Sequence, residues 1–314
     1  MRSPADLITT DVDRALERLR DGGLVAIPTE TVYGLAADAE DPAAVARIFE
    51  IKGRPTHHPL IVHVADLDHL DGWVDSLTDD AATLAGACWP GPLTMLLPRG
   101  RRVADAITGG RPTVGVRVPS HPLTLDLLRR FGGGVAAPSA NRFGKVSPTR
   151  AEHVFADIGT LLDPTRDVIL DGGSCPVGVE STIVDLTVAP PQMLRSGAIT
   201  ADEISRILDS PVHGASGPSR TSGMLVSHYA PECQVVLFDN AFDANHEASL
   251  RGDHGQHVHV LDRTDDLVTA ARELYNDLRA ADRAALDALI VVMPPASGIG
   301  HALRDRLMKA ATRS

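Results

Sequence analysis

Hydrophobic positions along this chain fall into short runs that are interleaved with helical patterns. Residues 11–20 predict an amphipathic helix, because Ala15, Leu16 and Leu19 recur on one face at helical spacing. The apolar run 24–27 follows two glycines and predicts a strand that Pro28 ends. The chain therefore begins with a helix and a strand that can pack into one core.

A second helix is expected between Asp41 and Gly53. The Asp41 side chain suits an N-cap, Pro42 suits the first helical position, and Gly53 suits a left-handed C-cap. The apolar positions of its buried face are Val45, Ile48 and Phe49. This helix would deliver the residues after Gly53 to a defined place beside the core.

The remaining pattern up to residue 209 mixes strands and helices. Apolar runs predict strands at 60–64, 93–97, 114–118, 135–137, 168–170 and 182–185. Helical patterns occupy 81–88, 123–130, 151–158 and 201–208. Because strands do not alternate strictly with helices, the pattern favours an α/β fold with a twisted, mixed sheet over a doubly wound order.

The periodicity stops between residues 210 and 231, where Gly, Ser and Pro are frequent. A new unit begins at Gln234, with strands expected at 235–238, 258–261 and 289–293 and long helices at 267–278 and 299–311. We therefore divide the chain into a domain of residues 1–209, a linker of residues 210–233 and a small Rossmann-like βαβ domain of residues 234–314.

Composition limits the classes of partner. The net charge of the 314 residues is −11, and general RNA or DNA binding needs clustered cations, so an anion site here must be local. Only three residues are lysines, and two of them lie beside the candidate motifs. Either a compact point charge is required there, or the positions arise by chance. Cys88, Cys175 and Cys233 form no CxxC pair, which fits a reducing cytosol.

The sequence also predicts a cytoplasmic protein without a membrane segment. The N-terminal residues are charged and helix-like, unlike a signal peptide. No apolar run approaches the roughly 20 residues needed to span a bilayer.

Lys52 and Arg54 are the first candidate site residues, because two cations stand where the helix ends at Gly53. Lysine is a compact charge and arginine a planar fork, so the pair suits the phosphates of a nucleotide. A solvated helix end is the alternative, since cations also stabilise a helix C-terminus. Pro55 and the strand that follows it fix the geometry and favour the phosphate clamp.

A second candidate is Pro138-Ser139-Ala140-Asn141, which follows the strand predicted at 135–137. Small residues there let a ligand approach the backbone, and Ser139 and Asn141 can hydrogen-bond to phosphate or ribose. The same four residues also make an ordinary turn. The nearby segment Ser147-Pro148-Thr149 either caps a helix that leads to Glu152 or belongs to the same site.

The strand around residue 115 offers a third candidate. Alternate strand residues share a face, so Thr113, Gly115 and Arg117 point the same way and the glycine leaves room for a ligand. Arg117 suits an amino-acid carboxylate, although an exposed arginine on a surface strand is the alternative. His58 and His63 flank the strand predicted at 60–64, where a lone histidine usually has a structural role.

Two further polar residues stand at strand ends. Ser181 precedes the strand predicted at 182–185 and has a hydroxyl that suits a substrate, and Arg195 could contact an adenine or a phosphate. The sequence contains no GxxxxGK[ST] loop and no serine or cysteine nucleophile elbow. No cysteine or carboxylate set completes a metal site around His254, His257 and His259.

Together these segments resemble the Sua5/YrdC family of threonylcarbamoyl-adenylate synthases. The motifs that carry the resemblance are, in order, PTETVYGL, KGRP with HHPLIVH, WPGPLT, VGVRVPSHP, APSAN with SPT, and GVESTIVD. It implies a YrdC-like catalytic domain and a Sua5-type C-terminal domain, with the linker folding back over the active site.

The resemblance implies a nucleotidyltransferase that condenses L-threonine, bicarbonate and ATP to L-threonylcarbamoyl-AMP and pyrophosphate, with Mg²⁺ accompanying ATP. A separate transferase would use the product to modify adenosine 37 of ANN-decoding tRNAs, so little direct nucleic-acid binding is expected. Lys52 and Arg54 would be catalytic, and Lys52 and Asn141 belong to the paired KxR and SxN signature. The threonine-binding residues would be Thr31, His63, Arg117, Ala137 through its backbone, and Ser181. The ATP-binding residues would be Arg54, His58, Thr113, Ser139, Asn141, Ser147, Arg195 and Tyr229.

Two other functions stay open from the sequence. The same fold occurs in carbamoyltransferase modules that handle carbamoyl-adenylate, usually beside an acylphosphatase or kinase-like domain that this sequence does not contain. A double-stranded RNA-binding module is the second alternative, which the acidic net charge disfavours.

Overall fold

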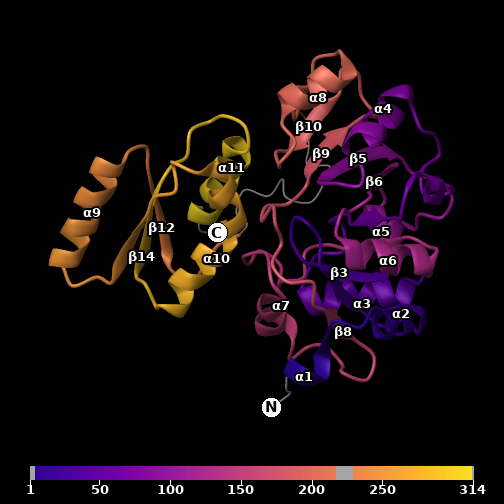
Figure 1. Ribbon diagram of the computed structural model, residues 1–314, viewed down its shortest axis with the longest axis horizontal. Helices are drawn as coiled ribbons and strands as arrows, with labels where there is room; N and C mark the ends of the chain where they lie inside the picture. Colours follow the sequence, from indigo (N-terminus) through magenta and orange to yellow (C-terminus); the bar gives the residue numbers. More distant parts are fainter. Residues whose placement is uncertain (1–3, 217–228, 313–314) are drawn as a thin grey trace.

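Two separate β-sheets organise the chain (Figure 1). The computed structural model describes residues 4–216 and 229–312. The larger sheet has eleven strands in the order β1-β8-β2-β3-β7-β4-β6-β5-β9-β10-β11, and the smaller has three in the order β12-β14-β13. The expected α/β fold with a mixed sheet and a second, smaller sheet is confirmed.

The larger sheet contains both parallel and antiparallel pairs. For example, β4 runs parallel to β6, whereas β5 runs antiparallel to β6. Its strands are β1 (Ile8–Thr9), β2 (Val25–Ile27), β3 (Gly34–Asp38), β4 (Ile61–His63), β5 (Leu93–Pro98), β6 (Thr113–Arg117), β7 (Val135–Ala136), β8 (Val168–Leu170), β9 (Thr182–Asp185), β10 (Gln192–Arg195) and β11 (His213–Gly214). The sequence analysis predicted β2 and β4 to β9, and it gave β10 only as a strand end at Arg195. It missed β1, β3 and β11, of which β3 pairs with both β2 and β7.

Helices of this unit pack on the sheet through the apolar faces that the sequence indicated. In α2, Ala15, Leu16 and Leu19 are buried as expected. The helices are α1 (Pro4–Leu7), α2 (Val12–Arg20), α3 (Pro42–Lys52), the 3-10 helix η1 (Leu67–Leu70), α4 (Asp79–Cys88), α5 (Asp105–Thr108), α6 (Pro122–Phe131), α7 (Ala151–Ile158) and α8 (Ala201–Leu208).

The ends of α3 have the caps that the sequence predicts. The Asp41 carboxylate accepts hydrogen bonds from the backbone N–H groups of Ala43 and Ala44. At the other end, Gly53 adopts a left-handed conformation with φ of 60°. These caps fix where the helix stops and therefore where Lys52 and Arg54 lie.

The smaller unit is a parallel three-stranded sheet with helices on both faces. Alternate residues of β14 face opposite sides, so Ile290 and Val292 pack with α9 and Leu289 and Val291 pack with α10 and α11. The elements are β12 (Gln234–Phe238), α9 (Ala241–Asp253), β13 (Val258–Leu261), α10 (Leu267–Arg283), β14 (Ala288–Val292) and α11 (Gly300–Ala311). The strand and helix order expected for this part of the chain is confirmed.

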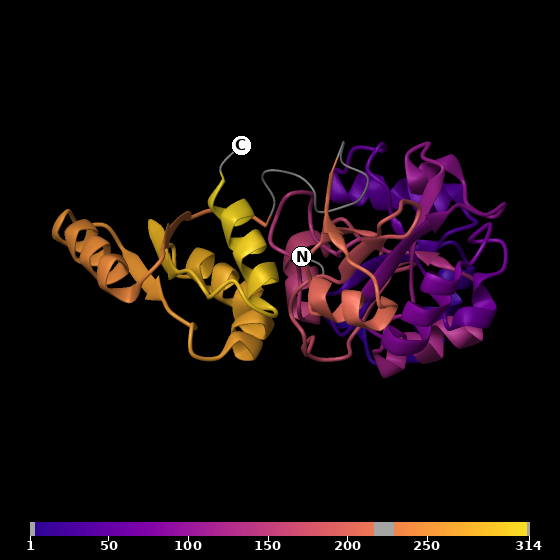
Figure 2. The ribbon, with the colours of Figure 1, turned by 90° about the horizontal axis from the view of Figure 1, so that it is seen from above.

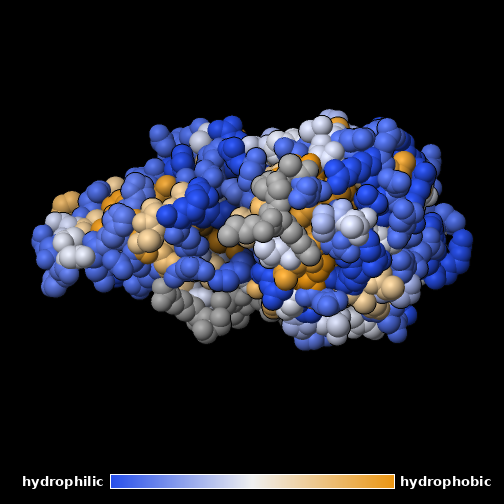
Figure 3. All heavy atoms as spheres, turned by 90° about the horizontal axis from the view of Figure 1, so that it is seen from below, coloured by the Kyte–Doolittle hydropathy of each residue, from blue (hydrophilic) through white to orange (hydrophobic). Residues whose placement is uncertain are grey.

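The two units meet through α10 and α11, whereas α9 lies at the far end of the molecule (Figures 1 and 2). Arg279 of α10 pairs with Asp157 of α7 across this junction, with a distance of 2.6 Å between Nη2 and Oδ2. The face in Figure 3 is largely hydrophilic, and its most hydrophobic area lies near the junction. The smaller unit is therefore held against the larger one by polar as well as apolar contacts.

The expected linker of residues 210–233 is described only at its ends. His213 and Gly214 form β11, which pairs with β10, so the larger sheet extends beyond residue 209. Residues 217–228 lie outside the described residues, and with them the middle of the expected linker. None of the helices that the structure describes is long and apolar enough to cross a membrane.

Candidate active site

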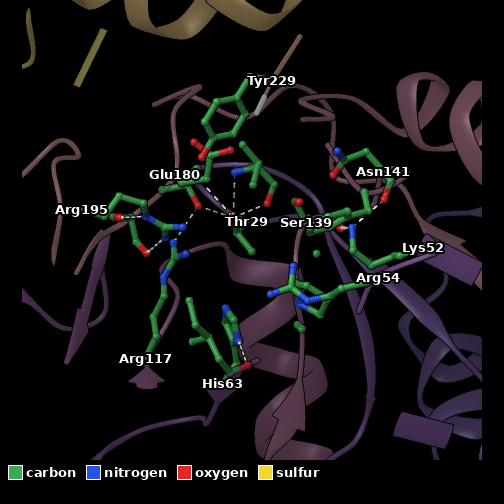
Figure 4. A pocket seen from close by; sticks show the side chains of 18 residues that line it. Thr29, Lys52, Arg54, His63, Arg117, Ser139, Asn141, Glu180, Arg195 and Tyr229 are labelled. Carbon is green, nitrogen blue, oxygen red and sulfur yellow. Dashed lines mark hydrogen bonds between the residues drawn. The ribbon is translucent and has the colours of Figure 1, made fainter. Parts of the chain in front are cut away.

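A cavity of about 690 Å³, counted with its open mouth, lies among the ends of β4, β6 and β10 and the segments that follow β2 and β7 (Figure 4). Most of the residues that the sequence singled out line it, namely Thr31, Lys52, Arg54, His63, Arg117, Ala137, Ser139, Asn141, Ser181, Arg195 and Tyr229. Segments far apart in the sequence therefore form one site.

Lys52 is buried, with 2% of its surface exposed, so the interpretation as a solvated helix end is wrong. Its Nζ donates hydrogen bonds to the backbone carbonyl oxygens of Ser139 and Asn141, each at 2.5 Å. Burial, and then the nearby charge of Arg54, lower the pKa of Lys52 well below its usual value. Lys52 therefore ties the end of α3 to the segment after β7, which forms the opposite wall.

Arg54 is also buried, and its guanidinium is held at the edge of the cavity. Its Nη2 donates to the carbonyl oxygen of Pro59 at 2.9 Å, and the guanidinium lies 5.7 Å from the centre of the Phe143 ring. Burial, and then the charge of Arg195, lower the pKa of Arg54 to about 10. Two buried cations that repel each other across one cavity favour an anion between them.

Arg117 is buried and paired, so the alternative of an exposed surface arginine is wrong. Its Nη2 lies 2.7 Å from Oε1 of Glu30 and 3.0 Å from Oγ1 of Thr31. Burial alone would raise the pKa of Glu30, but the Arg117 guanidinium and a hydrogen bond from the backbone N–H of Ser120 hold it below its usual value. Glu30 therefore stays ionised and fixes Arg117 at the cavity wall.

His63 lies at the end of β4 and is almost fully buried. Burial, and then the charge of Arg117, lower the pKa of His63 to about 3, so the ring is neutral at physiological pH. Its Nδ1 lies 3.2 Å from the carbonyl oxygen of Ile61, which can only accept a hydrogen bond. Nδ1 therefore carries the proton, and Nε2 is left as an acceptor for a donor group of a ligand.

Arg195 lies in the cavity wall near Arg117 (Figure 4), and Ser181 lines the same cavity. The Nε and Nη2 of Arg195 donate to the carbonyl oxygen and the hydroxyl of Ser181, each at 2.9 Å. The Ser181 hydroxyl also lies 2.8 Å from that of Thr94. The orientation of Arg195 is therefore set by Ser181, which directly precedes β9.

Glu180 also lines the cavity and is fully engaged. Its Oε1 accepts a hydrogen bond from the Ser147 hydroxyl at 2.6 Å, and its Oε2 accepts bonds from Tyr275 at 2.7 Å and Arg306 at 2.9 Å. The alternative that Ser147 caps a helix is wrong, because α7 starts after Arg150 and has no side-chain cap. The role of Ser147 in the structure is to hold Glu180.

Tyr229 lines the cavity from the side of the smaller unit and is 1% exposed. Its backbone has a φ of 64°, which is uncommon for a residue with a side chain. The ring lies 5.5 Å from that of Tyr275 and 5.4 Å from the Arg306 guanidinium. Packing against α10 and α11 therefore holds Tyr229 over the cavity.

Three of the predicted ATP-binding residues do not line the cavity. His58 packs edge-on against Phe143, with ring centres 5.3 Å apart, and Thr113 begins β6. Ser147 lies behind Glu180. Their roles in ligand binding stay predictions. His58 contacts Phe143 and Ser147 contacts Glu180, and Phe143 and Glu180 both line the cavity.

The sequence analysis missed the two carboxylates of the site. Glu30 and Glu180 stand directly before Thr31 and Ser181, which were singled out, so their positions in the motifs were visible. Their pairing with Arg117 and Arg306 was not, because the partners are far away in the sequence. Phe143, which supports Arg54, also gave no signal beyond its hydrophobicity.

The described residues offer no metal site. Among residues 4–216 and 229–312, no group of three or more His, Cys, Asp and Glu side chains is arranged to hold a metal ion. In the cavity itself, Glu30 and Glu180 are committed to arginines. A metal would therefore have to be bound mainly by oxygens of a ligand and of water.

The cavity belongs to the class of cation-lined sites that suit an anion, with buried cations from α3, β6 and β10 in its wall. Among the described residues that line it there is no cysteine, and the Ser181 hydroxyl contacts Thr94 and Arg195 and no histidine or carboxylate base. The family model described as telomere recombination, which covers the Sua5, YciO and YrdC proteins, matches residues 17–197. The chain belongs to this family. A second model, described as the threonylcarbamoyl-AMP synthase C-terminal domain, matches residues 199–312.

Individual proteins resemble the chain over nearly its whole length. The threonylcarbamoyl-AMP synthase of Pyrococcus abyssi is 38% identical, over 93% of this chain and 92% of the relative. The enzyme of the same name from Bacillus subtilis is 38% identical, over 98% and 95%. The crystal structure of P. abyssi Sua5 complexed with L-threonine has a TM-score of 0.89 and 37% identity, over 96% of this chain and 94% of that one. The similarity thus includes both units.

Proposed function

We propose that this protein is a threonylcarbamoyl-AMP synthase, an enzyme that condenses L-threonine, bicarbonate and ATP. The observation that carries the proposal is its similarity, across both units, to two enzymes of that name. The cavity supports it, because buried cations from separate segments surround a space that suits a triphosphate beside a small polar substrate.

We assign the threonine to the side of the cavity that holds His63 and Arg117 (Figure 4). The Nε2 of neutral His63 would accept a hydrogen bond from the amine or the hydroxyl of threonine. Arg117, oriented by Glu30, would attract the carboxylate. The full proposed set is Thr31, His63, Arg117, Ala137 and Ser181.

We assign the phosphates of ATP to the space between Arg54 and Arg195. An anion there would relieve the repulsion between the two guanidiniums. Lys52 would act by fixing the segment that carries Ser139 and Asn141, and Tyr229 would cover the nucleotide. The proposed set also includes His58, Thr113 and Ser147, which do not line the cavity.

The proposed reaction needs no protein nucleophile. Bicarbonate takes up a proton and loses water to give carbon dioxide, and the threonine amine attacks this carbon dioxide and releases a proton to become a carbamate. A carbamate oxygen then attacks the α-phosphorus, the bond to the bridging oxygen breaks, and pyrophosphate leaves. The chain's own residues orient the reactants and neutralise the charge that develops on the phosphates.

Mg²⁺ would enter with ATP as part of the substrate, held by phosphate and water oxygens, because the described residues supply no ligand cluster. The product is a labile mixed anhydride, and burial of the cavity would protect it from water. We propose that a separate transferase in the cytoplasm uses it to modify tRNA. The net charge of −11 is compatible with an enzyme that does not itself bind the RNA.

Pyrophosphate release tests this proposal against its alternatives. The purified protein is given ATP, Mg²⁺ and bicarbonate, with L-threonine, L-serine or neither. We expect release that depends on threonine and is weak with serine. Release that ignores threonine but responds to carbamoyl phosphate would instead identify a carbamoyltransferase, and salt-resistant binding of double-stranded RNA without turnover would identify an RNA-binding module.

A further inference from the structure

Two residues of the smaller unit hold a carboxylate that lines the active site of the larger one. Arg306 of α11 and Tyr275 of α10 both donate to Oε2 of Glu180, at 2.9 and 2.7 Å. The third partner of the Glu180 side chain is Ser147, which belongs to the larger unit. Most of the support of Glu180 therefore comes from across the junction.

Arg306 contacts the same wall of the cavity at further points. Its side chain is 0% exposed, its Nη2 donates to the carbonyl oxygen of Ser196 at 2.9 Å, and its guanidinium faces the Tyr229 ring. Ser196 directly follows Arg195, which lines the cavity. Helix α11 therefore contacts both the Glu180 side chain and the backbone directly after Arg195.

Removal of the Arg306 guanidinium while the units stay docked would leave Glu180 as a buried carboxylate without its cation. A buried charge without a partner is strongly unfavourable, so Glu180 would seek another cation. After Arg306, the cation with the strongest electrostatic effect on Glu180 is Arg195. At present Nε and Nη2 of Arg195 are directed to Ser181. Pairing with Glu180 would turn Arg195 and cancel its charge.

We propose that Arg306 and Tyr275 are positioning residues of the active site, which keep Glu180 away from Arg195 and so leave Arg195 oriented for an anionic nucleotide. This inference rests on the proposed function, and it adds that the smaller unit must be docked for ATP to bind well. Binding of ATP must then favour the docked arrangement to the same degree.

Calorimetric titration with Mg²⁺ and ATP, without threonine, tests the inference in four proteins. Arg306→Met should weaken ATP binding at least about tenfold, the lower part of the usual range for coupled sites. Glu180→Gln removes the charge that would capture Arg195, so the Arg306→Met/Glu180→Gln double variant should recover most of the affinity. Glu180→Gln alone is the reference for the double variant: adding Arg306→Met to it should weaken ATP binding much less than adding Arg306→Met to the unchanged protein.

The double variant distinguishes positioning from a merely structural role. If it binds ATP as weakly as Arg306→Met, or if Arg306→Met binds normally, the inference is wrong. Should Arg306→Met fail to fold, Tyr275→Phe offers the same comparison, because it removes one hydrogen bond to Glu180 and should also be rescued by Glu180→Gln. If Glu180→Gln restores ATP binding neither to Arg306→Met nor to Tyr275→Phe, the proposal is wrong.

Arg279→Met is the matched control at the junction. Arg279 pairs with Asp157 and donates to the carbonyl oxygen of Val146, so this variant weakens the junction without touching Glu180. Its loss of ATP affinity should be smaller than that of Arg306→Met and should not be recovered by Glu180→Gln. Normal ATP binding by the unchanged protein without threonine-dependent turnover would contradict the proposed function alone, whereas no ATP binding would contradict both.

Discussion

The side chain of Lys52 donates a hydrogen bond of 2.5 Å to the backbone carbonyl of Asn141, across 89 positions of the sequence. A second bond of the same length joins it to Ser139. This lysine is therefore a brace between two walls of the active site. It contrasts with Arg54, two residues later, whose guanidinium faces the cavity edge.

Lys52→Met should impair both folding stability and activity. The two carbonyl groups would lose their donor in a buried place, which costs about 1–3 kcal/mol for each unsatisfied group. Denaturant unfolding and pyrophosphate release, measured on the same samples, test this. Loss of activity with unchanged stability would show that Lys52 acts on the substrate and not through the segment that carries Ser139.

Arg54→Ala should affect activity far more than stability. Removal of one group that neutralises transition-state charge typically lowers kcat about 10²–10³-fold, and we expect a loss of this size. Arg99→Ala is the control, because Arg99 pairs with Asp105 outside the cavity. Full activity of Arg54→Ala in the pyrophosphate assay would remove Arg54 from the phosphate site.

Glu30→Ala should destabilise the fold by about 3–5 kcal/mol, because it leaves the buried Arg117 without its carboxylate. Denaturant unfolding measures the change. Asp71→Ala, at the exposed pair with Arg101, should have little effect. Equal effects of the two substitutions would mean that Arg117 finds another partner or water in place of Glu30.

His63 should make the protein less stable in mild acid. Its pKa is about 3 in the folded state and 6.5 in the reference state, so the unfolded chain binds more protons between these values and stability falls as the pH drops below about 6.5. Between pH 6.5 and 5 the contribution is up to about 2 kcal/mol.

Unfolding free energies of the unchanged protein and of His63→Gln, measured across that range, test the assignment. The unfolding free energy should change less steeply with pH in the variant. Part of the pH dependence should remain, because burial and then Arg279 lower the pKa of His153 to about 4. Parallel pH profiles would show that His63 is not the neutral, buried group described above.

Tyr229→Ala should weaken the retention of ATP more than it weakens folding. The ring packs against Tyr275 and Arg306 and covers the cavity. The backbone of residue 229 has a positive φ, which is as unfavourable for alanine as for tyrosine, so the substitution does not change this strain. Calorimetry with ATP and thermal unfolding separate the two effects. Unchanged ATP affinity together with unchanged turnover would contradict the covering role.

The sequence predicted elements well where local patterns decided them. Helix α3 is an example, because Asp41, Pro42 and Gly53 mark its ends and both caps form. Strand β3 was missed because Gly34–Asp38 holds glycine and alanines in place of β-branched residues. Its pairing with β2 and β7 makes it a strand, and that tertiary contact has no local signature.

The candidate site shows the same limit. Short motifs indicated Lys52, Arg117 and Ser181, because these polar residues stand at or next to the ends of predicted helices and strands. No local pattern indicated that Arg306 would reach Glu180 across 126 positions, since such a pairing depends on how the two units dock. It also could not show that Lys52 is buried, because a cation at a helix end is usually solvated.

The most direct measurement is the identity of the product. The protein is incubated with ATP, Mg²⁺, L-threonine and ¹³C-labelled bicarbonate, and the adenylates are analysed by mass spectrometry. The account predicts a threonine-dependent species with the mass of L-threonylcarbamoyl-AMP that contains the ¹³C label in its carbamoyl carbon, together with one pyrophosphate. An unlabelled threonyl adenylate, or no new adenylate in an ATP-binding sample, would contradict it.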